Sequence, residues 1–407
     1  MSVRKASGQR AGRDARLAKR AAKPVIDPCP PGQSGGAYRP LSDAEVRQIY
    51  ETALRLLTEL GMGEVPDRLR DLLGQHGATE HDSRVMFPRE LVEAAIASAP
   101  KTFELHGRDP ARTITVGGDA VHFGTGGAAV QTLDLDSGIY RESTLADLHQ
   151  FTRLQDTLAN VSWFTRCCIA TDVPDVFDLD VNTAYALMKN TTKPVATAFT
   201  VAENVEPIVK MFDIAAGGTG EFAKRPFVKA HISPVISPMR YGEDAVDVVF
   251  ECLKHNVPVS CITAAQAGAT APATMAGFLA QSLAETLASL VMVHVIKPGH
   301  PMIFSNWPLV IDLRTGAFAG GGGETALLNA ASAQISNWLG LPSGVAASMS
   351  DAKALDAQYG VEKGMTSLAA ALAGGNLIYE SSGMTASLFG ARFDDVILAV
   401  PLHSNTL

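Results

Sequence analysis

The chain has 407 residues, of which 46% are hydrophobic and 19% charged, and this length suits one main domain with an appendage. The formal net charge of -8 argues against broad nucleic-acid binding, which needs a basic face to displace counterions from phosphates. No membrane span is expected, because the most apolar stretch, 283–296, contains Glu285 and His294 and is typical of a buried helix. The five cysteines are irregularly spaced, which indicates no disulfide framework and favours a reducing cytoplasm.

The first 120 residues predict a tail followed by a small extension. Residues 1–40 are interpreted as a disordered basic tail that ends in a cluster of Pro and Gly. Ser42 and Glu45 then form a capping box at the start of a helix. Further helices and a strand-rich passage up to residue 120 complete a helical/strand extension, 41–120, which we interpret as a cap or an oligomer contact. A homo-oligomer is therefore expected.

From residue 121 to 382, apolar strand-like runs alternate with helical ones. The predicted strands are 121–133, 161–169, 194–199, 226–232, 257–262, 301–304, 344–347 and 376–379, and the predicted helices are 144–158, 177–189, 204–215, 243–255, 274–296, 325–339 and 361–373. Parallel strands need helical crossovers of this length, so the pattern predicts an α/β fold, a (β/α)8 TIM barrel. The alternative is an open doubly wound sheet, although no strand is followed by a GxGxxG turn. Residues 383–407 barely provide an eighth helix and are predicted to be a short, truncated end.

Functional side chains in such a barrel are expected where the strands end. Asp351 follows the small, apolar strand 344–347. Glu324 begins a helix after the glycine-rich loop 320–323, where the helix dipole favours a carboxylate. The loop lacks the Lys-Ser/Thr pair of a phosphate-binding P-loop, so we interpret it as a mobile loop over the barrel mouth.

Metal ligands are a second class of candidate. His231, Cys261 and His300 stand near three different strand ends and in principle suit zinc. No HxxE, HxxxH or CxxC motif supports such a site, and buried histidines and thiols are the simpler interpretation. We therefore predict no bound metal.

Several separated passages resemble the trimethylamine:corrinoid methyltransferase family. They are LPSGVAASMSDAKALDAQ at 341–358, VEKGM at 361–365, HGRDP at 106–110, FGTG at 123–126 and DLRTGAF at 312–318. The resemblance extends over about 41–397 and implies a (β/α)8 barrel. It also implies transfer of a methyl group from a small methylated amine to the cobalt of a separate, cognate corrinoid protein, in one-carbon metabolism related to methanogenesis. No cofactor bound in the chain itself is expected.

Met349 falls where methanogen members of that family carry pyrrolysine. Pyrrolysine is thought to hold the amine through an electrophilic imine, which a thioether cannot do. The resemblance therefore favours a substrate that arrives already activated, because a quaternary ammonium leaves as a neutral tertiary amine when Co(I) attacks its methyl group. Pyrrolysine-free members include glycine betaine methyltransferases, so a betaine-like quaternary amine, or a tertiary one, is the expected substrate.

These considerations give a predicted site. Asp351 and Glu324 are its predicted catalytic residues, and Trp307 is expected to face the cation because aromatic faces attract quaternary ammonium groups. The predicted substrate-binding residues are His231, Phe199, Gln266, Asn306, Trp307, Met349, Gln358 and Tyr359. Met349, Asp351, Glu324, His231 and Trp307 are predicted to converge on one cavity.

Two other functions remain open at this point. A barrel that binds a small molecule but has lost turnover would keep the same pattern. A lyase or decarboxylase barrel would use the same carboxylates for acid–base catalysis.

Overall fold

The computed structural model describes residues 34–397, and within them eight parallel strands form one curved sheet. Their order in the sheet is β6, β20, β19, β16, β14, β11, β10, β9. The strands are β6 (His122–Phe123), β9 (Phe164–Thr165), β10 (Val195–Thr197), β11 (Val228–Ile232), β14 (Val259–Thr263), β16 (Met302–Asn306), β19 (Ser343–Ala346) and β20 (Leu377–Tyr379). A parallel bridge between Gly124 and Trp163 joins the two edges, which confirms the predicted (β/α)8 barrel.

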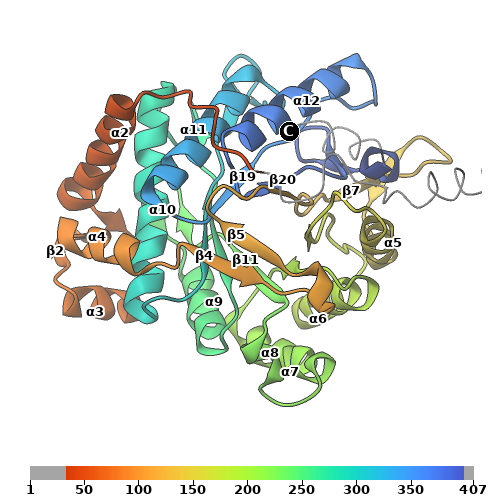
Figure 1. The fold of residues 1–407 in the computed structure, drawn as a ribbon, viewed down its shortest axis with the longest axis horizontal. Helices are drawn as coiled ribbons and strands as arrows, with labels where there is room; N and C mark the ends of the chain where they lie inside the picture. The colour runs from red at the N-terminus through yellow and green to blue at the C-terminus, as the bar shows by residue number, and fades with distance from the viewer. Residues whose placement is uncertain (1–33, 398–407) are drawn as a thin grey trace, which may run out of the picture. The chain divides into compact units, whose positions relative to one another are not determined.

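Helices follow the strands and lie outside them (Figure 1). They are α5 (Leu145–Asp156), α6 (Val176–Asn190), α7 (Val205–Ala216), α9 (Glu243–Lys254), α10 (Met275–Ile296), α11 (Gly323–Leu339) and α12 (Ala357–Leu372), with the short α8 (Glu221–Lys224) after α7. All except α8 overlap a predicted helix, and α8 was not expected from the sequence. The long first run of the barrel divides into β6 and β7 (Gln131–Leu133), and β7 pairs with β8 (Tyr140–Glu142) as an antiparallel hairpin.

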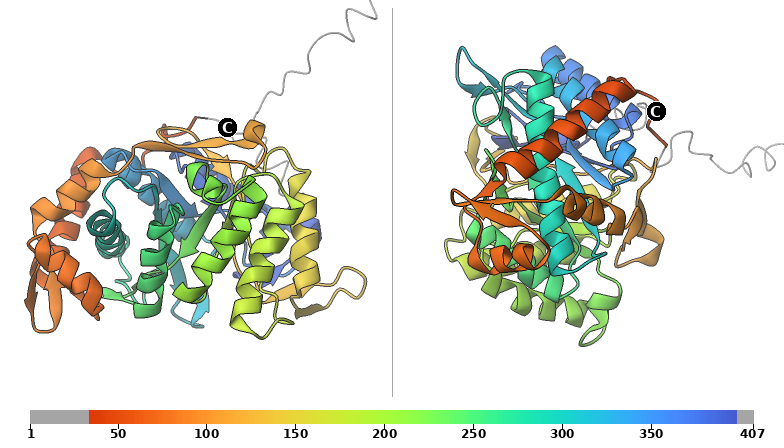
Figure 2. Two further views of the ribbon diagram at one scale, coloured as in Figure 1. Left: turned by 90° about the horizontal axis from the view of Figure 1, so that it is seen from below. Right: turned by 90° about the vertical axis from the view of Figure 1, so that its left-hand side faces the viewer.

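The extension consists of α2 (Asp43–Arg55), α3 (Asp67–Gln75), α4 (Arg89–Ser98) and the short strands β1 (Met62–Gly63), β2 (Thr79–His81) and β3 (Arg84–Met86). The capping box at its start forms as predicted, because Ser42 Oγ accepts from Glu45 N at 3.3 Å and the Glu45 carboxylate accepts from Ser42 N at 2.7 Å. Helices α2 and α4 pack on α10, and α2 crosses it in the right-hand view of Figure 2.

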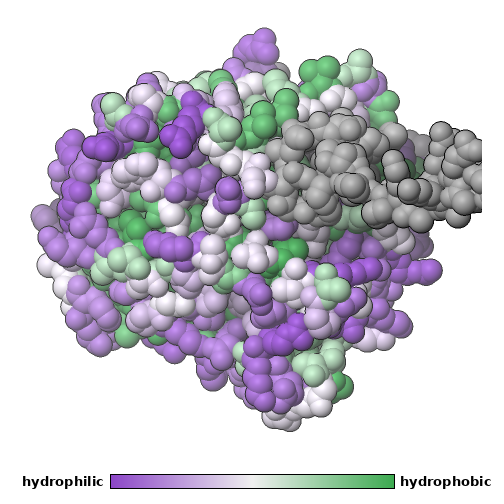
Figure 3. Space-filling view, in the orientation of Figure 1, coloured by the Kyte–Doolittle hydropathy of each residue, from purple (hydrophilic) through white to green (hydrophobic). Residues whose placement is uncertain are grey.

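Helix α10 is apolar on all sides because it lies between the sheet and the extension. In the part of the chain that the structure describes, it is the one helix long and apolar enough to cross a membrane, and 83% of its apolar window is buried inside the protein. On the face shown in Figure 3, hydrophilic side chains predominate, with apolar ones scattered among them.

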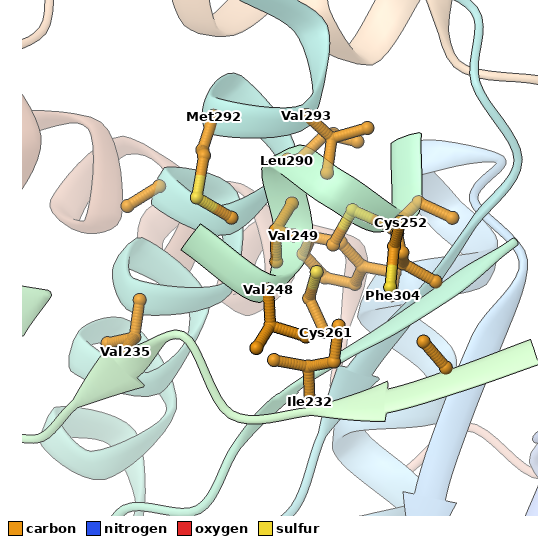
Figure 4. Close-up of a cluster of buried hydrophobic side chains, with 14 of the residues drawn as sticks. Ile232, Val235, Val248, Val249, Cys252, Cys261, Leu290, Met292, Val293 and Phe304 are labelled. Carbon is orange, nitrogen blue, oxygen red and sulfur yellow. The ribbon is translucent and has the colours of Figure 1, made fainter. Parts of the chain in front are cut away.

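Two layers of core follow from the alternation of side chains along the strands. The outer layer packs the sheet against the helices, and Figure 4 shows Ile232 and Cys261 beside Val248 and Cys252 of α9 and Leu290 of α10. The inner layer fills the barrel with the buried side chains of Trp163, Ile262, Ile303, Trp307, Ala346, Met349, Leu377 and Tyr379. The hairpin of β4 (Thr102–Leu105) and β5 (Ile114–Gly117) contributes Leu105 and Val116 to this layer.

Residues 1–33 and 398–407 lie outside the described part of the chain. Most of the predicted basic tail, 1–40, and the terminal sequence PLHSNTL therefore stay predictions, as do the boundaries at residues 120 and 382.

Candidate active site at the carboxyl end of the barrel

A chain of hydrogen bonds crosses the middle of the barrel. Lys229 Nζ donates to Tyr379 Oη at 2.8 Å, Tyr379 Oη is 2.8 Å from Ser260 Oγ, and Ser260 Oγ is 2.8 Å from Ser305 Oγ. The Lys229 amine also lies 4.9 Å from the ring centroids of both Trp163 and Tyr379. Burial lowers the pKa of Lys229 to about 7, because the charged amine loses its water. The interior therefore holds a desolvated amine between two aromatic rings.

His231, Trp307 and Met349 form the next layer toward the carboxyl ends of the strands. The ring of His231 is 5.3 Å from that of Trp307 and 5.6 Å from that of Tyr379, and Trp307 is 4.7 Å from Tyr379, all in edge contacts. Met349 packs in the same buried cluster. Three of the residues expected to converge are thus brought together here.

Polar atoms in this layer lack partners. Trp307 Nε1 and His231 Nδ1 are buried without a hydrogen bond in the described structure. Burial lowers the pKa of His231 well below its usual value, and the charges of Lys229 and Arg166 lower it further. His231 is therefore a neutral imidazole, able to donate one hydrogen bond and accept another. Buried unsatisfied groups are rare in proteins, so such a concentration points to a ligand or ordered water.

Glu380 adds a buried carboxyl group at the end of β20. Its Oε1 accepts from Gly127 N at 3.3 Å, its Oε2 has no partner in the described residues, and burial raises its pKa to about 7. A Cβ on Gly126 would lie 1.8 Å from Oε2, and a Cβ on Gly124 would lie 2.0 Å from the ring of Trp163. The glycines of the FGTG passage therefore leave space for Glu380 and Trp163.

Asp351 anchors the glycine-rich loop. Its carboxylate accepts from the backbone N–H groups of Gly320 at 2.9 Å and Gly321 at 3.0 Å, and from Ser387 Oγ at 2.8 Å. A Cβ on Gly320 would lie 3.2 Å from Met349 Sδ. Asp351 thus holds the loop down beside Met349, and both of its oxygens are engaged in doing so.

Two predicted binding residues point away from the barrel interior. Asn306 Nδ2 donates to Ser282 Oγ of α10 at 3.1 Å, because Ser305 before it points inward and successive strand residues alternate. Phe199 packs in the large cluster between the sheet and the helices. Neither side chain lies in the cluster that holds Trp307.

Four other predicted residues lie around the mouth or behind it. Glu324 is exposed in the first turn of α11, and Gln358 is exposed at the start of α12. Tyr359 is buried, and its hydroxyl donates to Asp395. Gln266 is partly buried in β15 (Gln266–Ala267), which pairs with β17 (Leu309–Asp312). Glu324 is thus exposed, whereas the layer with which it was expected to converge is buried.

The zinc ligands considered from the sequence do not meet. His231 points into the barrel, Cys261 packs in the outer core, and His300 Nε2 is hydrogen-bonded to Val257 O at 2.8 Å. Among residues 34–397, no group of three His, Cys, Asp or Glu side chains is placed to hold a metal ion.

A separate cavity lies outside the barrel. It measures about 430 Å³ and is lined by Arg39, Lys101 and Trp338, between the extension and the end of α11. Its position away from the orphaned groups of the barrel makes it a weaker candidate, since chemistry in these barrels is found at the carboxyl ends of the strands.

The fold is a (β/α)8 barrel, and buried polar atoms without partners gather toward the carboxyl ends of its strands. The chain matches the trimethylamine methyltransferase (MTTB) family over residues 9–403. It belongs to this family, and it is a methyltransferase. The match confirms the family expected from the separated sequence passages.

Individual relatives agree with this assignment. The chain is 30% identical to a glycine betaine methyltransferase of Desulfitobacterium hafniense, over 91% of this chain and 78% of the relative. It is 31% identical to the trimethylamine methyltransferase MttB of another strain of D. hafniense (87% and 71%) and 30% identical to that of Methanosarcina barkeri (88% and 74%). Among solved structures, a dihydropteroate synthase from Coxiella burnetii is similar at a TM-score of 0.42 and 13% identity, over 75% of this chain and 98% of that one. The fold assignment above rests on the sheet topology and not on this similarity.

Proposed function

We propose that this methyltransferase moves a methyl group from a betaine-like quaternary ammonium compound to the cobalt of a separate corrinoid protein. Met349 carries the proposal. It packs beside Trp307 in the buried layer, at the position where the family resemblance places pyrrolysine. A thioether is apolar and polarizable, so it contacts methyl groups well but offers neither an electrophile nor a proton.

The chemistry of the leaving group explains why this suffices. When Co(I) attacks the methyl carbon, a cobalt–carbon bond forms, the carbon–nitrogen bond breaks, and its electron pair stays on nitrogen. A quaternary ammonium thereby leaves as a neutral tertiary amine and needs no proton. The enzyme then has to position and desolvate its substrate rather than activate it.

The aromatic interior supports a cationic substrate. Lys229 already lies over the rings of Trp163 and Tyr379, whereas no described residue places a cation over Trp307. The Glu380 carboxyl group, with one free oxygen, adds negative charge near the same layer when it is ionised. A neutral tertiary amine is a second candidate, because Glu380 retains a proton near pH 7 and can give it to the nitrogen, which then leaves as a neutral secondary amine when Co(I) takes the methyl group. The corrinoid partner, a homo-oligomeric state and a cytoplasmic location belong to this proposal.

The proposal is tested by incubating the full chain with reduced cobalamin and a panel of betaines and methylamines, and following methylcobalamin by absorbance. We expect transfer from at least one quaternary compound. No formation of methylcobalamin with any compound of the panel would contradict the proposed methyl transfer. Thermal stabilisation by a betaine without transfer would instead favour a binding protein, and proton release without corrinoid would favour a lyase.

Trp307→Ala is expected to weaken binding of the quaternary substrate by about 1–2 kcal/mol, the size of a partly desolvated cation–π contact. Isothermal titration with the best substrate of the panel measures this. Trp338→Ala, at an exposed position on α11, is the control and should leave the affinity unchanged. Unaltered affinity in Trp307→Ala would remove this ring from the cation site.

Met349→Leu is expected to keep binding and most turnover, because volume-conserving apolar exchanges usually cost less than about 1.5 kcal/mol. Rates of methylcobalamin formation and substrate affinity are compared with those of the wild type. If the variant binds substrate normally but transfers no methyl group, the sulfur takes part in the reaction and a positioning role is ruled out.

A further inference from the structure

Arg166 is a cation without a partner near the site. It follows β9, it is only partly exposed, and its guanidinium makes no hydrogen bond or ion pair within residues 34–397. Burial lowers the pKa of Arg166, while the charge of Asp180 on α6 opposes this shift. Asp180 makes no direct ion pair with the guanidinium, and its oxygens instead accept from Thr200 and Asn204 at 2.6–2.8 Å.

A guanidinium that is partly removed from water and has no anion beside it is unfavourable, and proteins retain such groups where a ligand completes the pair. Arginine is suited to this role because its planar fork of N–H donors matches a carboxylate with two parallel hydrogen bonds. The five donors of Arg166 are all available for this purpose.

The backbone of Arg166 lies near His231, which belongs to the buried layer with Trp307 and Met349. A Cβ built on Gly127 would lie 3.8 Å from the carbonyl oxygen of Arg166 and 3.8 Å from Nε2 of His231, so both residues border this glycine. The charge of Arg166 also acts on His231. His231 in turn lies 5.3 Å from Trp307. The backbone of Arg166, the neutral imidazole of His231 and the ring of Trp307 therefore lie close to one another at the mouth of the barrel.

We propose that Arg166 determines specificity by binding the carboxylate of a zwitterionic substrate, while His231 donates a further hydrogen bond and the quaternary ammonium end lies against Trp307. This inference rests on the proposed function. In a glycine betaine, one methylene separates the cation from the carboxylate, which suits neighbouring subsites. A cation without a carboxylate would leave Arg166 unpaired and bring a like charge near it, so the same residue selects against simple methylammonium ions.

The test compares the wild type with Arg166→Gln and Arg166→Lys, using calorimetric titration of glycine betaine and of tetramethylammonium. We expect Arg166→Gln to lose about tenfold or more in affinity for glycine betaine, because charge-assisted hydrogen bonds disappear. Its affinity for tetramethylammonium should stay the same or rise. Arg166→Lys should fall between the two for glycine betaine, since it keeps the charge but not the fork. Arg153→Gln, on the exposed side of α5, is the matched control and should behave as the wild type.

Each contrary outcome is informative. Unchanged affinity for glycine betaine in Arg166→Gln, or an equal loss for both ligands, would overturn the carboxylate assignment. Binding of glycine betaine that depends on Arg166 without methyl transfer would contradict the proposed function and leave the inference standing. Methyl transfer with unaltered selectivity in Arg166→Gln would contradict the inference alone, and a wild type that binds neither ligand would contradict both.

Discussion

The stability of Lys229→Met relative to the wild type is expected to depend strongly on pH. Burial lowers the pKa of Lys229 from 10.5 to about 7, so between these values the unfolded wild type binds a proton that the folded wild type does not. Stability of the wild type therefore rises with pH across this window. Each unit of pKa shift corresponds to about 1.4 kcal/mol. As the pH rises through this window, the stability of Lys229→Met relative to the wild type should therefore fall by up to about 5 kcal/mol.

Urea unfolding of both proteins at a series of pH values from 6 to above 10 measures this difference. Loss of the hydrogen bond to Tyr379 shifts the whole curve but does not change its slope, so the slope reports the pKa. Lys254→Met, at an exposed position on α9, is the control and should give a much flatter difference. Parallel curves for Lys229→Met and the wild type would mean that the buried amine keeps its ordinary pKa.

Asp395→Ala is expected to lower the free energy of unfolding by about 3–5 kcal/mol, the usual cost of breaking a buried ion pair from one side. Asp395 lies 3.4 Å from Lys363 Nζ with both side chains fully buried, and it also accepts from the Tyr359 hydroxyl. Lys363 Nζ donates to the carbonyl oxygen of Glu380 at 3.1 Å as well. Loss of Asp395 therefore leaves unpaired the lysine that holds the backbone of Glu380, the residue with the buried carboxyl group.

Denaturant unfolding measures the cost, with Glu59→Ala as the control. The Arg55–Glu59 pair is exposed, so its loss should cost well under 1 kcal/mol. Adding Lys363→Met to Asp395→Ala should recover much of the stability, because no unpaired charge then remains buried. A cost below about 1 kcal/mol in Asp395→Ala alone would show that this pair does not hold the end of the barrel together.

The barrel itself was predictable because its signal is local. Apolar runs such as 226–232 and 257–262 overlap β11 and β14, and the helix periodicity between them is strong enough to locate α9. The capping box at Ser42 is equally local, since it needs only two side chains three residues apart. When such local strand and helix patterns alternate along the chain, few sheet topologies are compatible with them.

The site was predictable only in part, because a strand end does not reveal which neighbour faces inward. Asn306 and Trp307 are adjacent, and both were expected to bind substrate. The structure turns Trp307 toward His231 and Asn306 toward α10. A shift of one residue reverses the face of every side chain, so strand register rather than composition decides between them.

Residue type and spacing were sufficient for the fold class, the family resemblance and the place of Met349 beside the barrel mouth. The burial of Lys229, the free oxygen of Glu380 and the unpaired guanidinium of Arg166 came only from the tertiary structure. A charged residue in a sequence carries no information about whether water or a partner will surround it. That depends on which distant strands and loops close over it, and desolvation by those segments sets its pKa and its capacity to bind a ligand.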